Sequence, residues 1–181
     1  SGASGGILGA AYLRELYLLQ QEGYPLSLYD STFIDDMGRD LLNPVSFAII
    51  SNDLFFPVST FRSGAFIYRK DRGYLLERQL NENCRGLLGK QLADYRQPEY
   101  EAKIPMMVIS PFVLNDSRRL LISPLGVSYL MQPPDNHRRT LQPEVDGVDF
   151  RRLFARQQAD SLAFTTALRM NCTYPLILPS T

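Results

Sequence analysis

A short glycine-rich segment followed at once by a helical pattern constrains this chain more than any other feature. Residues 2–6 read Gly-Ala-Ser-Gly-Gly. From Gly5 to Glu22, apolar residues recur near a period of 3.6, which predicts an amphipathic helix. Gly23 is a favourable C-cap and Pro25 prevents the helix from resuming. The segment predicts a tight strand-to-helix turn carrying Ser4, with glycines where a Cβ would clash with the neighbouring strand and helix.

The pattern Gly2-x-Ser4-x-Gly6 fits the nucleophile elbow of serine hydrolases, in which the turn exposes the serine hydroxyl. We therefore predict Ser4 as a catalytic nucleophile. The backbone N–H of Gly5 and the positive end of the following helix would stabilise the oxyanion. An elbow also needs a strand leading into it, and only Ser1 precedes Gly2. We expect the chain to be an excerpt of a larger hydrolase domain.

Two other interpretations of the turn stay open. A glycine-rich strand-to-helix turn can bind phosphate, as in nucleotide-binding folds. Those turns follow G-x-G-x-x-G or G-x-x-x-x-G-K-[ST], and the glycines at 2, 5, 6 and 9 fit neither pattern. The small residues could also serve only the packing of the helix against a sheet.

A nucleophilic serine needs a general base, and histidine is the usual one. The single histidine, His137, lies in a Pro-, Asp- and Arg-rich segment that is typical of an exposed turn. We expect His137 to be a solvated loop residue. Either a histidine lies in sequence outside this chain, or a carboxylate alone acts as the base.

Both ends of the chain resemble the patatin-like phospholipases, which combine a G-x-S-x-G elbow with a Ser-Asp dyad and no histidine. The first match is Gly2–Gly6 followed by the run Ile7–Leu13, rich in small residues. The second is Thr166–Pro179 (TALRMNCTYPLILP), which is similar to the helix-to-proline segment that precedes the catalytic aspartate in bacterial members. The middle of the chain matches only in outline.

The resemblance implies a three-layer α/β/α serine hydrolase fold over residues 1–181, incomplete in this chain, and lipid acyl hydrolase activity of the phospholipase A type. The family's aspartate opens a D-G-G or D-G-A motif after the proline segment. Asp146-Gly147 is the one Asp-Gly pair here, but it comes before that segment. We expect Asp146 to serve a turn and the start of a helix. The catalytic aspartate is expected beyond Thr181, so residues 1–181 alone should have little esterase activity.

Two further functions stay open beside this one. An α/β-hydrolase esterase with a Ser-His-Asp triad would share the elbow and place its histidine downstream. A non-catalytic member of the fold would keep the architecture without the chemistry. The sequence suggests no cofactor and no metal site. The expected partner is a lipid or ester at a membrane surface, and the expected location is cytoplasmic or membrane-associated.

Composition excludes several other classes. The 19 basic and 19 acidic residues balance, which argues against a nucleic-acid binder. No apolar run reaches the length of a transmembrane helix. The two cysteines, Cys84 and Cys172, show no metal or disulfide spacing, and we expect buried thiols. The pairs Arg138-Arg139 and Arg151-Arg152 could attract anionic head groups, although exposed arginine pairs are usually solvated.

The rest of the chain predicts a mixture of helices and strands. Apolar spacing, continuous apolar runs and turn residues are the signals used. The expected elements are short helices within Leu26–Phe61, a helix over Asp71–Gly89, a strand buried on both faces over Lys103–Leu114, a hairpin partner over Arg118–Ser123, a loop over Gln132–Pro143 and a helix over Phe150–Met170.

Overall fold

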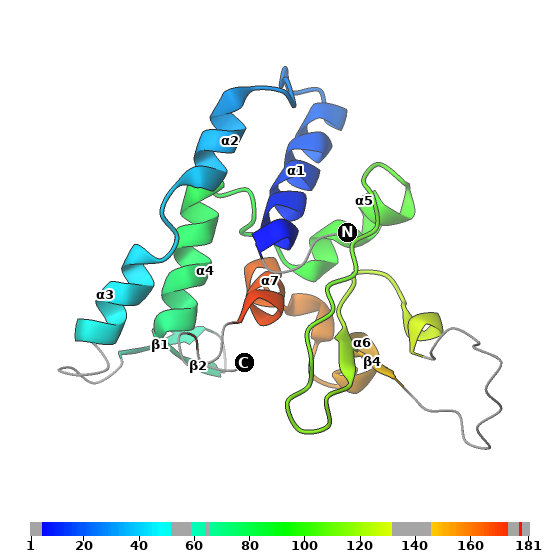
Figure 1. Cartoon of the computed structure of the whole chain (residues 1–181). Coiled ribbons are helices and arrows are strands. Elements are labelled where there is room, and N and C mark those ends of the chain that lie inside the picture. The colour runs from blue at the N-terminus through cyan, green and yellow to red at the C-terminus, as the bar shows by residue number, and fades with distance from the viewer. Residues whose placement is uncertain (1–4, 52–58, 64–65, 132–145, 174–177, 179–181) are drawn as a thin grey trace. The chain divides into compact units, whose positions relative to one another are not determined.

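The computed structural model describes residues 5–51, 59–63, 66–131, 146–173 and 178 (Figure 1). The chain mixes helices with small sheets and divides into two compact units. Unit 1 comprises Ser1–Gly89 and Cys172–Thr181, and unit 2 comprises Lys90–Asn171. Whether residues 1–181 form one domain stays a prediction.

Unit 1 contains four helices and one β-hairpin among its described residues. They are α1 (Gly5–Gln21), α2 (Ser31–Gly38), α3 (Asn43–Ser51), β1 (Thr60–Ser63), β2 (Phe66–Arg69) and α4 (Arg72–Asn83). The short helices expected between Leu26 and Phe61 are confirmed by α2 and α3.

Helix α1 confirms the predicted helix, and its C-terminal end lies where the sequence predicts. It ends with a Schellman motif, in which the Gly23 N–H bonds the Gln20 carbonyl at 3.1 Å and the Tyr24 N–H bonds the Leu19 carbonyl at 3.1 Å. Gly23 has a φ of +93°, a left-handed conformation that glycine adopts without a steric penalty. The predicted C-cap is therefore correct.

Helix α4 begins where the sequence predicts and ends earlier. The Asp71 carboxylate caps it by accepting a 3.0 Å hydrogen bond from the Tyr74 N–H. Arg85 and Gly86 then take positive φ values of 55° and 80°. Two consecutive left-handed residues cannot continue a right-handed helix, so the predicted extension to Gly89 is wrong.

The core of unit 1 joins distant parts of the chain. Val45 of α3, Leu76 of α4 and Leu178 form one buried cluster, with Leu41 packed against it. Tyr12 of α1 meets the Phe33 ring of α2 edge-on, with ring centroids 6.1 Å apart. These contacts tie the helices of unit 1 to each other and to the segment that follows α7.

Unit 2 consists of short elements joined by turns. They are η1 (Leu92–Tyr95), α5 (Arg96–Tyr100), β3 (Arg119–Leu121), η2 (Ser128–Leu130), β4 (Gly147–Asp149), α6 (Phe150–Leu153), η3 (Ala159–Ser161) and α7 (Phe164–Cys172), whose last residue belongs to unit 1. Strands β3 and β4 pair in parallel, with Leu120 opposite Val148.

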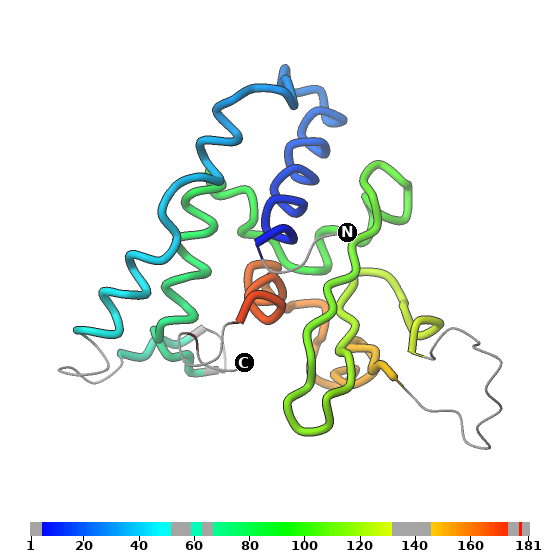
Figure 2. The backbone as a smooth tube through the Cα atoms, viewed as in Figure 1, coloured from blue at the N-terminus to red at the C-terminus, as the bar shows by residue number. Residues whose placement is uncertain are grey.

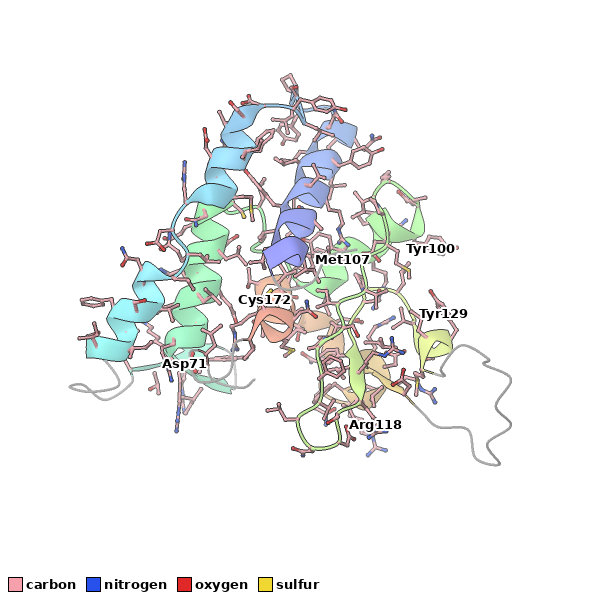
Figure 3. The ribbon with its side chains drawn as sticks, in the orientation of Figure 1. Asp71, Tyr100, Met107, Arg118, Tyr129 and Cys172 are labelled. Atoms are coloured by element: carbon pink, nitrogen blue, oxygen red, sulfur yellow. The ribbon has the colours of Figure 1, made fainter. Side chains whose placement is uncertain are left out.

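The predicted hairpin of unit 2 is confirmed in its pairing. Ile109 and Ile122 exchange two backbone hydrogen bonds of 2.9 Å, as opposed residues of an antiparallel pair do. Ser117 has a φ of 59° in the turn, next to Arg118 (Figure 3). The two arms of the hairpin can be followed in Figure 2.

The strand predicted over Lys103–Leu114 is wrong, because only single bridges form, at Ile109 and Phe112. Pro105 and Pro111 have no N–H to donate to a ladder. The run is also not buried on both faces, since Phe112 and Leu114 are largely exposed. The continuous apolar run therefore led to the wrong prediction of a strand.

The single helix predicted over Phe150–Met170 is also wrong. Helix α6 ends at Leu153, Gln158 takes a left-handed conformation with a φ of 55°, and α7 begins at Phe164. Residues 155–161 offer no large apolar side chain for a helix to bury. Helix α7 ends at Cys172, two residues beyond the predicted end at Met170.

At the level of fold class, the mixture of helices and sheets agrees with an α/β protein in general. The described residues contain a two-stranded antiparallel sheet and a two-stranded parallel sheet. The three-layer arrangement stays a prediction. Among the described helices, none has the length and apolar character needed to cross a bilayer.

Candidate functional site

The start of α1 is the part of the predicted site that the structure describes. Ser4 and the loop over Gln132–Pro143, with His137 and Arg138-Arg139, lie outside the described residues. Gly5 is the first residue of α1, directly after the predicted nucleophile. Gly5 and Gly6 are exposed, while Ile7 and Leu8 on the other side of the first turn are buried.

The first turn of α1 suits an anionic group. An α-helix leaves its first N–H groups without helical partners, and its dipole makes this end positive. The first turn of α1 contains no acidic residue that would offset this charge. Because α1 has 17 residues, its dipole is fully developed. This end of the helix could therefore stabilise negative charge on a group bound next to Gly5.

Among the described residues, no steric clash explains the glycines at positions 5, 6 and 9. A Cβ built on Gly5, Gly6 or Gly9 meets no described atom within 4 Å. All three also have ordinary helical backbones, so alanine would fit. The strand with which the clash was predicted is not among the described residues, so the clash itself stays a prediction. Among the described residues, the glycines leave open space beside this part of the helix.

A groove lies farther along α1, where it faces α2 and the segment before it. Its volume is about 390 Å³. Seven of its eight lining residues are apolar or aromatic, and Asp30 is the exception, capping α2 through the Thr32 N–H at 2.9 Å. The lining residues are Leu13, Leu16, Leu28, Tyr29, Asp30, Phe33, Ile34 and Met37. Hydrophobicity patterns did not predict this groove, because two helices and the turn between them form it only after folding.

Asp146 takes a different role from the one predicted. It pairs with Arg119 of β3, whose Nη2 lies 2.5 Å from Asp146 Oδ2, and its backbone carbonyl accepts from the Arg119 N–H at 3.1 Å. The side chain that starts the next helix is Asp149, which accepts from the Arg151 N–H at 2.9 Å and from Ser128 Oγ at 2.7 Å. The predicted role of Asp146 in starting a helix is therefore wrong by three positions. As a weaker candidate for the catalytic base, Asp146 stays a prediction.

The two arginines of the pair Arg151-Arg152 have different roles. Arg151 Nε lies 2.9 Å from Asp160 Oδ1, and Arg96 also binds the Asp160 carboxylate. Burial opposes ionisation of Asp160, but the two guanidinium groups outweigh it and lower its pKa. Arg152 is exposed. The pair therefore supplies one structural arginine and one surface arginine.

The most strongly organised polar cluster of unit 1 was not predicted. The Asp36 carboxylate, only 1% exposed, accepts from the Tyr12 hydroxyl at 2.8 Å. Arg85 Nε lies 2.6 Å from its Oδ2 and Arg39 Nη2 lies 3.0 Å from its Oδ1. The three-residue spacing of Asp36 and Arg39 on a helix was a usable signal. The contacts to Tyr12 and Arg85 needed the tertiary fold.

The donors around Asp36 favour the ionised form of its side chain. Burial opposes ionisation of Asp36, yet the hydrogen bonds from Tyr12 and Arg85 and the nearby positive charges lower its pKa. Burial, followed by the hydrogen bond to Asp36 and then by the charge of that carboxylate, raises the pKa of Tyr12 well above its ordinary value. Both groups therefore keep one protonation state near neutral pH, which indicates a structural role.

Neither cysteine has the lowered pKa of a reactive thiol. Cys84 is fully buried and Cys172 is half-buried. Burial, with the charge of Asp36 adding to it, raises the pKa of Cys84 to about 12, and burial raises the pKa of Cys172 to about 11. The described part of the chain holds no group of three or more His, Cys, Asp or Glu side chains arranged for a metal ion.

Comparisons with known proteins add no family assignment. No protein-family model matches the chain, and neither a curated protein nor a solved structure does. The likeness to patatin-like phospholipases accordingly depends on the two sequence segments alone. The functional conclusion has to come from those segments and from the geometry at the start of α1.

Proposed function

We propose that this chain is part of a lipid acyl hydrolase of the patatin-like type, with Ser4 as its nucleophile. The observation that carries the proposal is the G-x-S-x-G pattern at residues 2–6, whose last two residues lie in the described part of α1. An elbow requires a helix to begin immediately after the serine, with its N-terminal N–H groups free to face the reacting oxygen. The three-layer fold belongs to the same proposal.

The chemistry follows from this arrangement. The Ser4 Oγ attacks the ester carbonyl carbon while a carboxylate base takes the hydroxyl proton. The carbonyl oxygen becomes an oxyanion next to the Gly5 N–H and the positive end of α1. As the acyl–oxygen bond breaks, the leaving alcohol receives the proton. Water then attacks the acyl-enzyme, which releases the carboxylic acid and restores the serine.

The groove beside α1 supports a lipid substrate over a small polar ester. Leu13 comes eight residues after Gly5, and a helix rises about 1.5 Å per residue, so Leu13 lies about 12 Å along α1 from its start. On the same side of the helix, Gly6 and Ala10 are exposed. An acyl chain attached at Ser4 could lie across these small residues and end in the apolar groove. Long acyl chains would then be preferred over short ones.

Covalent labelling tests the nucleophile directly. A fluorophosphonate probe should label the full-length protein at Ser4, and Ser4→Ala should abolish the labelling. Ser27→Ala is the matched control, because Ser27 is an exposed serine of the same unit outside the proposed site. Labelling that persists in Ser4→Ala, or no labelling of the full-length protein, contradicts the proposal.

The pH profile of ester hydrolysis then separates a carboxylate base from a histidine base. With an aspartate base, kcat/KM should be level from neutral pH down to about pH 5, because the ordinary pKa of aspartate is about 3.9. With a histidine base it should fall through about pH 6.5. A fall near that second value would replace the dyad with a Ser-His-Asp triad.

A further inference from the structure

We propose that one end of unit 1 binds the surface of an anionic lipid bilayer. The docking surface consists of Phe47 and Ile50 of α3 together with Arg62, Ile67 and Arg69 of the β1–β2 hairpin. The proposal goes beyond the proposed function, because binding of a bilayer by these residues does not require Ser4 to react.

Helix α3 provides the apolar part of the docking surface. Residues 41–51 carry no charge. Val45 and Ala48 face the interior of unit 1 at 1% and 0% exposure, whereas Phe47 and Ile50 are 70% and 61% exposed. Phe47 and Ile50 are three residues apart, so they are neighbours on the outer face. A helix that is apolar on both faces is expected to be covered on both, and here one face lies open.

The two faces of the β1–β2 hairpin carry different side chains, because successive residues of a strand point to opposite faces. Phe61 and Tyr68 oppose each other and stack at 5.4 Å, and Phe61 also contacts the Tyr74 ring of α4 at 5.2 Å. Arg62 opposes Ile67 on the other face. Arg69, two residues after Ile67, shares that face, and all three side chains are exposed.

The two parts lie at the same end of α4. Val45 of α3 packs against Leu76, and Phe61 of the hairpin packs against Tyr74, so both contacts fall near the start of this helix. Figure 1 shows α3 and the hairpin at this end, and Asp71 marks the start of α4 in Figure 3. The exposed apolar side chains of α3 and the exposed cations of the hairpin are therefore parts of one region of unit 1.

The charge of this end selects the partner. Residues 59–72 contain four basic residues and one acidic residue, Asp71. The Asp71 carboxylate caps α4 and keeps its charge, so basic residues still outnumber acidic ones in this stretch. Lys70 lies on the other face of the hairpin, with its Nζ 5.8 Å from the centre of the Phe61 ring. Exposed Arg62 and Arg69 beside the exposed Ile67, at the same end of unit 1 as the exposed Phe47 and Ile50, match an anionic head-group layer above a hydrocarbon interior.

Vesicle binding by the full chain tests the basic residues. The protein should sediment with vesicles of phosphatidylcholine and phosphatidylserine but only weakly with phosphatidylcholine alone, and binding should fall at high salt. The double change Arg62→Gln, Arg69→Gln should weaken binding about thirtyfold, since each cation near such a surface contributes about 1 kcal/mol. The control removes the same charge from unit 2 by Arg118→Gln and Arg152→Gln, and should retain binding.

The apolar residues are tested in the same assay. Phe47→Ala should weaken binding about ten- to a hundredfold, because it removes an apolar side chain that inserts into the bilayer. Phe112→Ala is its matched control, since Phe112 is 67% exposed in unit 2. Circular dichroism establishes that each variant is folded. If a variant unfolds, Arg62→Lys with Arg69→Lys is used instead and should keep the binding of the wild type.

Several results would overturn the proposal. They are no binding to phosphatidylserine vesicles, equal losses in the two double variants, and a solution dimer that Phe47→Ala dissociates, which would assign the surface to a second copy of the chain. Ser4→Ala should bind vesicles like the wild type. Loss of vesicle binding and loss of fluorophosphonate labelling are therefore separate failures, one for each proposal.

Discussion

The Tyr12 hydroxyl donates a 2.8 Å hydrogen bond to Asp36 Oδ2 and so connects α1 to α2 through a buried carboxylate. The two residues are 24 positions apart. Arg85, beyond the end of α4, binds the same carboxylate oxygen. One carboxylate thereby holds together the first two helices and the turn after the fourth.

Removing the Tyr12 hydroxyl should destabilise unit 1. We expect Tyr12→Phe to lower the free energy of unfolding by about 1–2 kcal/mol, because a buried carboxylate loses one of its donors. Tyr17→Phe is the control, since Tyr17 lies on the exposed side of the same helix, and its effect should be within about 0.5 kcal/mol. Urea unfolding followed by circular dichroism measures both. Equal effects of the two changes would contradict a structural role for the Tyr12–Asp36 bond.

The same carboxylate should make unit 1 sensitive to acid. The pKa of Asp36 is lower in the folded protein than in the unfolded chain. Its contribution to stability is therefore fully present above the unfolded pKa of about 3.9 and is lost as the pH falls through the lower folded value. Asp36→Asn should be less stable than the wild type near neutral pH, by about 2–3 kcal/mol. The difference should shrink below about pH 4. A difference that is constant with pH would show that ionisation of Asp36 is not involved.

Neither cysteine should react readily in the folded protein. The pKa values of about 12 for Cys84 and about 11 for Cys172 leave both as protonated thiols at pH 8, and the thiolate is the reactive form. Iodoacetamide should modify both within minutes in urea and neither under native conditions. Mass spectrometry of the peptides gives the extent at each site. Rapid native modification of Cys84 would mean that the helices around it open frequently.

Asp146 and Asp149 of unit 2, three positions apart, should differ sharply in how much they contribute to stability. Asp149→Ala removes the cap of α6 and the acceptor for Ser128 Oγ from a side chain that is 2% exposed, and should cost about 2–3 kcal/mol of stability. Asp146→Ala breaks one solvent-exposed ion pair with Arg119, and should cost less than about 1 kcal/mol. Thermal unfolding compares the two. A larger loss for Asp146→Ala would reverse the assignment of the cap.

The sequence was a good guide where local chemistry decides the structure. Apolar periodicity together with Gly23 located α1, and Asp71 marked the start of α4, because caps depend on residues within one turn. It was a poor guide where the tertiary environment decides. Pro105 and Pro111 interrupt an apolar run that was expected to be a strand. The parallel pairing of β3 with β4 joins segments that carry no pairing signal of their own.

In the candidate site, too, local sequence predicts some features, and others depend on the tertiary fold. Ser4 and Gly5 follow from a five-residue pattern; Gly5 lies in α1, and Ser4 as the nucleophile stays a prediction. The groove and the docking surface were not predicted, since exposure of Phe47 and Ile67 is a property of the packed molecule. Alternation and helical spacing indicate which residues share a face. They do not indicate which face another element covers.

Leu178 belongs to the same hydrophobic cluster as Val45 and Leu76, although the whole of unit 2 lies between them in the chain. During synthesis on the ribosome, unit 2 is a continuous segment and can be completed first. The earlier part of unit 1 has to wait for residue 178 before its interior is filled. Chaperones that shield exposed apolar side chains would therefore be needed most in the interval between the emergence of Leu76 and that of Leu178.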